Sequence, residues 1–167
     1  KADGLFYADK AQLESMGAKV HMEADVHKID FDAKKVFVKL KDGSEIEDTY
    51  DKIILATGSL PIIPNIPGKD LENVQQVKLY QNAAEVIEKL KNPDIKDVVV
   101  VGAGYIGVEL AEAFERLGKT VTMVDIAETC LPAYYDEPFT SLMKENLASH
   151  NINLEFGQTV QEIKGTD

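Results

Sequence analysis

The segment "DVVVVGAGYIGVELAEAFERLGKTVTMVDI", residues 97–126, constrains the fold more than any other part of this chain. A run of valines leads into a glycine-rich turn, then into apolar residues at helical spacing, and finally into a second apolar run that ends in an acid. This order predicts strand, turn, helix and strand, which together make one βαβ unit. Because a βαβ unit places its strands parallel in one sheet, we expect an α/β protein.

The glycines of the turn follow the pattern G-x-G-x-x-G, which is typical of dinucleotide-binding sites. Gly102 permits the tight turn, Gly104 lets a pyrophosphate approach the backbone, and Gly107 lets the helix pack close to the strand. The start of the helix offers N–H groups and the positive end of its dipole to a phosphate. We therefore predict a dinucleotide contact from Gly102, Ala103, Gly104, Tyr105, Ile106 and Gly107.

The acid at the end of the second strand is Asp125, which lies 23 residues after Gly102. In dinucleotide-binding units an acid about 20 residues after the first glycine binds the ribose diol. A carboxylate there repels a 2′-phosphate, so the pattern favours NAD over NADP. The alternative is a glycine turn that only packs a helix onto a strand, and the complete strand–turn–helix–strand–acid context argues against it.

The first part of the chain has a different pattern. Residues 11–17, "AQLESMG", predict a short helix, and alternation around Val20, over 26–31 and over 35–40 predicts strands separated by turns. The run "DKIILATG", residues 51–58, is typical of a strand buried on both faces. The following "SLPIIPNIPGKD" contains three prolines and is interpreted as a linker.

Beyond the linker, the sequence predicts helices over 80–92 and 135–151, and strands over "INLEFG" and "TVQEIK". We divide the chain into residues 1–60, a linker with a connecting helix over 61–92, and residues 93–167, which carry the glycine turn.

Charge and composition exclude several classes of function. The formal net charge of −11 argues against nucleic acid or an anionic membrane as partner. One cysteine, Cys130, permits no intrachain disulfide, and the scattered histidines indicate no metal site. No apolar run is long enough to span a bilayer and the first residues lack a signal-peptide pattern, so a cytoplasmic location is the default expectation.

Three longer motifs resemble one family. "GAGYIGVELAEAF" with "VTMVDIAETCLPAYYDEPF" resembles the NAD-binding domain of flavin-dependent NADH oxidases, which belong with NADH peroxidase and coenzyme-A disulfide reductase to the pyridine nucleotide–disulfide oxidoreductases. "YDKIILATGS" resembles their second FAD-contacting motif, and residues 4–36 are most similar to the water-forming oxidases. The resemblance implies parts of two Rossmann-like three-layer domains, the first with an antiparallel β-meander.

The resemblance also implies roles for residues near the glycine turn. Tyr105 and Ile106 would lie along the nicotinamide side, where the tyrosine shields the flavin and moves away when NADH arrives. Glu109 would lie near the nicotinamide carboxamide, and Asp125 would hold the adenosine ribose. At the adenine end the resemblance favours Tyr134 over the tyrosine that follows it, although both also fit ordinary surface aromatics.

For FAD, the resemblance implies contacts from Ala56, Thr57 and Gly58 at the end of their predicted strand. Val26 would contact the flavin nucleotide's adenine through its backbone. Lys78 matches a position at which the family often has a basic residue near the flavin.

Other family features are not found in this sequence. The N-terminal FAD fingerprint, the third FAD motif and the dimerisation domain are missing, and the redox cysteine is expected upstream of Lys1. We therefore expect an internal fragment of a larger homo-oligomeric enzyme, without a catalytic residue or turnover of its own. Cys130 is interpreted as an ordinary loop cysteine.

The resemblance implies hydride transfer from NADH to FAD, followed by reduction of dioxygen to water. Two alternatives remain. In the first alternative, the electron acceptor is peroxide or coenzyme-A disulfide instead of dioxygen. In the second, the chain is a non-catalytic nucleotide-binding module.

Overall fold

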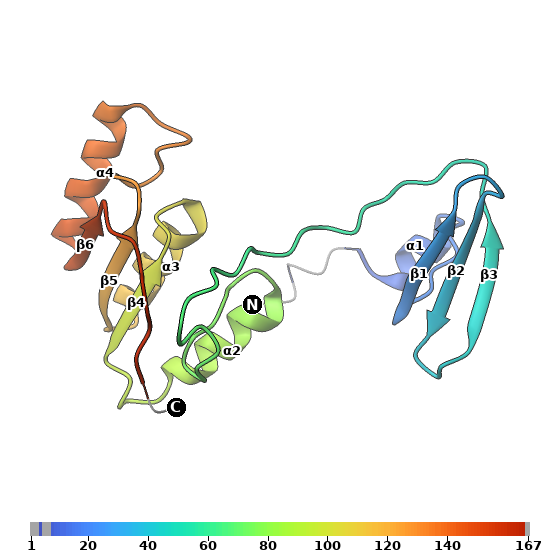
Figure 1. Ribbon diagram of the computed structural model, residues 1–167, viewed down its shortest axis with the longest axis horizontal. Coiled ribbons are helices and arrows are strands. Elements are labelled where there is room, and N and C mark those ends of the chain that lie inside the picture. Colours follow the sequence, from blue (N-terminus) through green and yellow to red (C-terminus); the bar gives the residue numbers. More distant parts are fainter. Residues whose placement is uncertain (1–3, 5–7, 166–167) are drawn as a thin grey trace. The chain divides into compact units, whose positions relative to one another are not determined.

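The structure is a computed structural model, and it describes residue 4 and residues 8–165. The chain forms two compact units, Lys1–Gly58 and Ser59–Asp167 (Figure 1). The division after Gly58 lies two residues before the predicted boundary, and the segment predicted as a linker falls within the second unit.

The first unit contains a short helix and an antiparallel sheet. Asp9 caps the helix, since its carboxylate accepts a hydrogen bond of 2.7 Å from the backbone N–H of Gln12. The strands follow one another in space as they do in sequence, so the predicted β-meander is confirmed (Figure 1). The elements are α1 (Lys10–Ser15), β1 (Ala24–Asp30), β2 (Lys35–Leu40) and β3 (Glu45–Thr49).

Three predicted strands are wrong. Residues 51–58 have no regular structure, and Ile54 and Leu55 are 90% and 59% exposed. A strand needs a neighbour to pair its backbone groups, and within the described residues no strand pairs with this run. The segment around Val20 is also irregular, and so is "TVQEIK", where Ile163 instead donates a backbone hydrogen bond to Pro67.

The second unit contains the predicted βαβ unit and a second one that continues from it. Its three strands are parallel and lie in the order β4-β5-β6, with Val98 opposite Val121 and Val121 opposite Ile152. The predicted α/β class is therefore confirmed. The elements are α2 (Tyr80–Leu90), β4 (Asp97–Val101), α3 (Tyr105–Arg116), β5 (Thr120–Asp125), α4 (Glu137–Ser149) and β6 (Ile152–Phe156).

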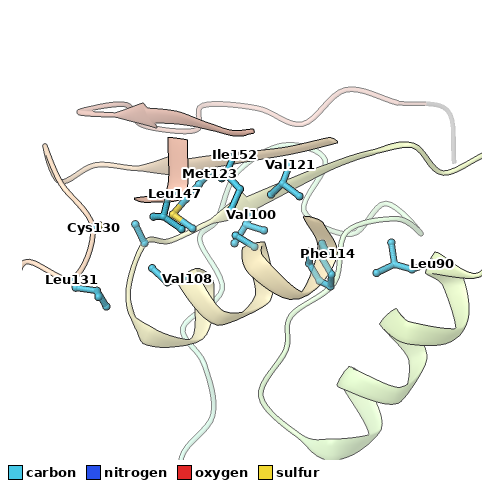
Figure 2. Packing of buried hydrophobic residues seen from close by; sticks show 12 residues of the cluster. Leu90, Val100, Val108, Phe114, Val121, Met123, Cys130, Leu131, Leu147 and Ile152 are labelled. Carbon is cyan, nitrogen blue, oxygen red and sulfur yellow. The ribbon is translucent and has the colours of Figure 1, made fainter. Parts of the chain in front are cut away.

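One apolar cluster holds the second unit together (Figure 2). Because α3 and α4 both contribute to this single cluster, they pack on the same side of the sheet, and Leu90 extends the cluster to α2. The members are Leu90, Val100, Ala103, Val108, Ala111, Phe114, Val121, Met123, Cys130, Leu131, Leu147 and Ile152.

Two leucines of α4 provide a matched test of this core. Leu147 is fully buried in the cluster, whereas Leu142 is 63% exposed. We expect Leu147→Ala to lower the free energy of unfolding of the second unit by about 3 kcal/mol through the lost burial and the cavity left behind. Leu142→Ala is expected to change it by less than about 0.5 kcal/mol. Urea denaturation followed by circular dichroism measures both, and equal effects would contradict this packing.

Candidate dinucleotide site at the glycine turn

The glycine turn leaves β4 at the carboxyl edge of the parallel sheet, where ligands bind in open α/β sheets. Gly102 has φ +108°, a conformation that favours glycine, and its N–H donates to the carbonyl of Val124 at 2.8 Å. This bond continues the β4–β5 pairing by one residue. The turn therefore begins directly beside the end of β5.

Gly107 allows α3 to approach the turn closely. A Cβ built at this position would overlap the carbonyl oxygen of Gly102 and would lie 2.9 Å from its carbonyl carbon. Both atoms belong to the backbone, so neither can rotate away. The predicted role of Gly107 in close helix packing is thus seen as a direct approach of α3 to the turn.

Gly104 is different, because nothing in the chain requires a glycine there. Its φ of −78° and ψ of −173° suit any residue, and a Cβ would meet no atom within 4 Å. The first backbone N–H of the helix to find an acceptor is that of Val108, which donates to Gly104 at 3.0 Å. Within the described residues, no acceptor is found for the N–H groups of Gly104, Tyr105, Ile106 and Gly107.

The N–H groups without an acceptor and the open space beside Gly104 lie together at the start of α3. The first N–H groups of a helix need an external acceptor, and the helix dipole makes an anion the favoured one. The residues present therefore fit a pyrophosphate over Gly104.

Asp125 lies at the end of β5 and fastens the turn to it. One carboxylate oxygen accepts from the N–H of Ala103 at 2.6 Å, and the other accepts from the N–H of Ala127 at 2.7 Å. A carboxylate has about four acceptor positions, so both oxygens can still accept a hydroxyl hydrogen bond. The sequence predicted the ribose acceptor but gave no indication that the same side chain also orders the turn.

The segment 126–136 closes back on the turn through Leu131. Its N–H donates to the carbonyl of Ala103 at 2.8 Å, and its side chain is 2% exposed. Leu131 also has φ +55°, a left-handed conformation that costs a leucine about 1–2 kcal/mol. Packing in the core holds it there. No sequence pattern marks this residue, because left-handed turns are normally signalled by glycine or asparagine.

Aromatic side chains gather beside the start of α3. The Tyr105 ring centroid lies 4.5 Å from that of Tyr134 and 6.2 Å from that of Tyr135. The hydroxyls of Tyr105 and Tyr135 are hydrogen-bonded at 2.6 Å. This bond, together with weaker effects of burial and of Tyr134 and Glu109, raises the pKa of the Tyr105 phenol. The structure thus brings Tyr135 to the site as well as the expected Tyr134.

The other predicted contacts lie at exposed positions of the two units. Glu109 is exposed on α3, and Lys78 is exposed just before α2. Val26 lies in β1 with its side chain half exposed, and residues 56–58 are exposed and irregular. Within the described part of the chain, no hydrogen bond or ion pair joins Val26 to residues 56–58.

Cys130 lacks the environment of a reactive thiol. It is fully buried in the core, its sulfur lies 3.9 Å from the carbonyl oxygen of Thr140, and burial raises its thiol pKa. A raised pKa keeps the thiol protonated, whereas nucleophilic cysteines are thiolates. The described residues contain no cluster of metal-ligating side chains. None of the helices described is long and apolar enough to cross a membrane.

Comparison with known proteins places this site in a family. The model of the pyridine nucleotide-disulphide oxidoreductases matches residues 2–167. The chain belongs to this family. Over 98% of its length it is 56% identical to an NADH oxidase of Streptococcus pyogenes, of which it spans 38%. The resemblance inferred from the sequence motifs is therefore confirmed.

Two solved structures of this family have a similar fold. A water-forming NADH oxidase of Lactobacillus brevis bound to NADH matches 99% of the chain with a TM-score of 0.91 and 36% identity. An engineered water-forming NADPH oxidase bound to NADPH, a mutant of that enzyme, matches 99% with a TM-score of 0.92 and 35% identity. The chain spans 37% of each of these proteins.

Proposed function

We propose that the glycine turn binds NADH and that the chain serves an FAD-dependent NADH oxidase. The observation that carries the binding proposal is the set of free N–H groups at the start of α3, which face open space at Gly104. The pyrophosphate would accept hydrogen bonds from these groups, and the ribose hydroxyls would donate to Asp125. The identity of 56% to a protein named NADH oxidase supports the activity.

The preference for NADH over NADPH is supported by residue spacing. In the engineered NADPH oxidase, the substituted aspartate lies 18 residues after the substituted glycine, and the substituted proline lies 25 residues after that same glycine. Here Asp125 follows Gly107 by 18 residues and Pro132 follows it by 25. Three of the five residues changed to accept NADPH thus have the same identities here as in the NADH enzyme, whereas Ile126 and Ala127 stand where that enzyme has alanine and methionine. The shared aspartate favours NADH for this chain.

The first unit would contribute to the FAD site. The backbone of Val26 and the segment Ala56, Thr57 and Gly58 are the proposed contacts, with Lys78 near the flavin. Bound FAD would take up a hydride from NADH and deliver electrons to dioxygen, which is reduced to water. The residues of this chain would hold and orient the two nucleotides. Tyr105, Ile106 and Glu109 would face the nicotinamide.

Oxygen stoichiometry in the complete protein tests the proposed activity. We expect two NADH oxidised per dioxygen consumed, because reduction to water takes four electrons, and no accumulation of peroxide. The 167 residues alone should show no steady NADH consumption, since the proposed FAD contacts at residues 56–58 are exposed and irregular. One NADH per dioxygen with peroxide released, or turnover only with peroxide or a disulfide, would contradict the proposal.

A further inference from the structure

Glu128 lies in the loop that follows Asp125, the proposed ribose contact. Two backbone bonds join this loop to the turn that follows β6. The N–H of Gly157 donates to the carbonyl of Ala127 at 2.9 Å, and the N–H of the next residue donates to the carbonyl of Asp125 at 3.0 Å. Because β4, β5 and β6 are parallel neighbours in one sheet, the loop and this turn lie at the same carboxyl edge as the glycine turn.

The Glu128 carboxylate lies against the turn after β6. A Cβ built at Gly157 would lie 2.8 and 3.0 Å from its two oxygens, so the carboxylate is directly beside the Gly157 α carbon. The nearby Lys144 is engaged elsewhere, since its Nζ donates to the backbone carbonyl of Glu128 at 3.3 Å and lies 5.7 Å from the centre of the Phe156 ring. Among the described residues, no ion pair includes Glu128. The loop therefore carries a second negative charge, besides that of Asp125, without a paired cation.

The loop that contains Glu128 corresponds to a segment that is altered in the engineered NADPH oxidase. That protein has arginine at the positions that match Ile126 and Pro132, and serine at the position that matches Ala127. The two arginines lie on either side of the Glu128 position in the sequence, which is not among the positions changed. A phosphate monoester carries about −1.5 to −2 charges, so added cations favour its binding and an unpaired anion opposes it.

We propose that Glu128 is a further specificity-determining residue, whose carboxylate disfavours the 2′-phosphate of NADPH in addition to Asp125. The inference rests on the proposed function, because it assumes an adenosine ribose at Asp125. The proposed dinucleotide runs from the turn after β4 to Asp125 at the end of β5, and the Glu128 carboxylate lies at the next strand end, that of β6. Neighbouring strands lie about 4.8 Å apart, which is within the Debye length of about 8 Å at physiological ionic strength. The charge therefore acts on a phosphate at the ribose without touching it.

Glu128→Gln tests this charge, because it keeps the length of the side chain and removes only the charge. In fluorescence titrations at low ionic strength, we expect the variant to bind NADPH about 2- to 5-fold more tightly, the size of effect expected of an exposed charge at this range. NADH has no 2′-phosphate, so its affinity should change less, and the preference for NADH should shrink. The control is Glu145→Gln, which removes the same charge from an exposed position about 12 Å further along α4 than its first residue, and it should leave the preference unchanged.

The salt dependence separates a charge effect from a structural role. At 1 M salt the Debye length is about 3 Å, so the gain in NADPH affinity should disappear. If Glu128 only supported the loop, Glu128→Gln would change both affinities alike, and the change would persist in high salt. Native NADH binding with an unchanged preference in Glu128→Gln, or a change that high salt leaves intact, would overturn the role of Glu128 and leave the proposed function standing. Absence of NADH binding by the native chain would overturn both.

Discussion

Gly107→Val is expected to prevent the second unit from folding stably. The valine Cβ would overlap the Gly102 carbonyl oxygen, and only a shift of α3 away from the turn would relieve this overlap. We expect a loss of at least about 4 kcal/mol of unfolding free energy, which is in the exceptional range for one substitution. The engineered NADPH oxidase has alanine in place of a glycine at the matching spacing, so a shift can accommodate a Cβ alone. Valine is chosen because its two additional methyl groups demand a larger shift.

Ile106→Val is the matched control for this substitution. It places the same β-branched residue in the same helical turn, at a side chain that is 55% exposed. Its effect on unfolding should stay within about 0.5 kcal/mol. Urea denaturation followed by circular dichroism measures both variants. A Gly107→Val protein with the native midpoint would show that α3 does not approach the turn as described.

Asp125→Ala should impair stability and selectivity together. Two backbone N–H groups, of Ala103 and Ala127, lose their acceptor, which we expect to cost about 2–4 kcal/mol. The ribose acceptor and the charge that repels a 2′-phosphate are lost as well. NADH affinity should therefore fall at least about 10-fold, equivalent to about 1.4 kcal/mol, while NADPH affinity should not fall with it.

Asp125→Asn separates these two effects. It keeps one acceptor oxygen and nearly the same shape but removes the negative charge, so more of the stability should remain. The native preference for NADH over NADPH should still shrink, as measured by fluorescence titration with each nucleotide. A native ratio of the two dissociation constants in Asp125→Asn would contradict the assigned role of the carboxylate charge.

Local patterns predicted the second unit well because its elements depend on nearby residues. The valine run, the glycine turn and the helical spacing after Tyr105 specify β4, α3 and β5 within 30 residues. The run 51–58 has an equally clear strand composition, but a strand also needs a partner, and the described chain provides none. The composition of residues 51–58 therefore indicated a buried strand, but it contains no information on which strand this segment would pair with.

In the candidate site, the sequence identified residues but not their connections. The predicted roles of Gly102 and Gly107 agree with their conformation and packing. The double backbone contact of Asp125 and the left-handed Leu131 depend on tertiary contacts that carry no local signal. The sequence indicated Tyr135 only as the aromatic residue next to Tyr134. Its hydrogen bond to Tyr105 could not be predicted, because the two residues are 30 positions apart.

The NADH dissociation constant of Gly104→Ala tests the central claim most directly. A methyl group at Gly104 meets nothing in the chain, so the free energy of unfolding should be unchanged or raised by about 0.4–1 kcal/mol. The same methyl would occupy the space proposed for the pyrophosphate. We predict native stability with NADH affinity lowered at least about 10-fold. Native affinity in this stable variant would contradict binding of the dinucleotide over the glycine turn.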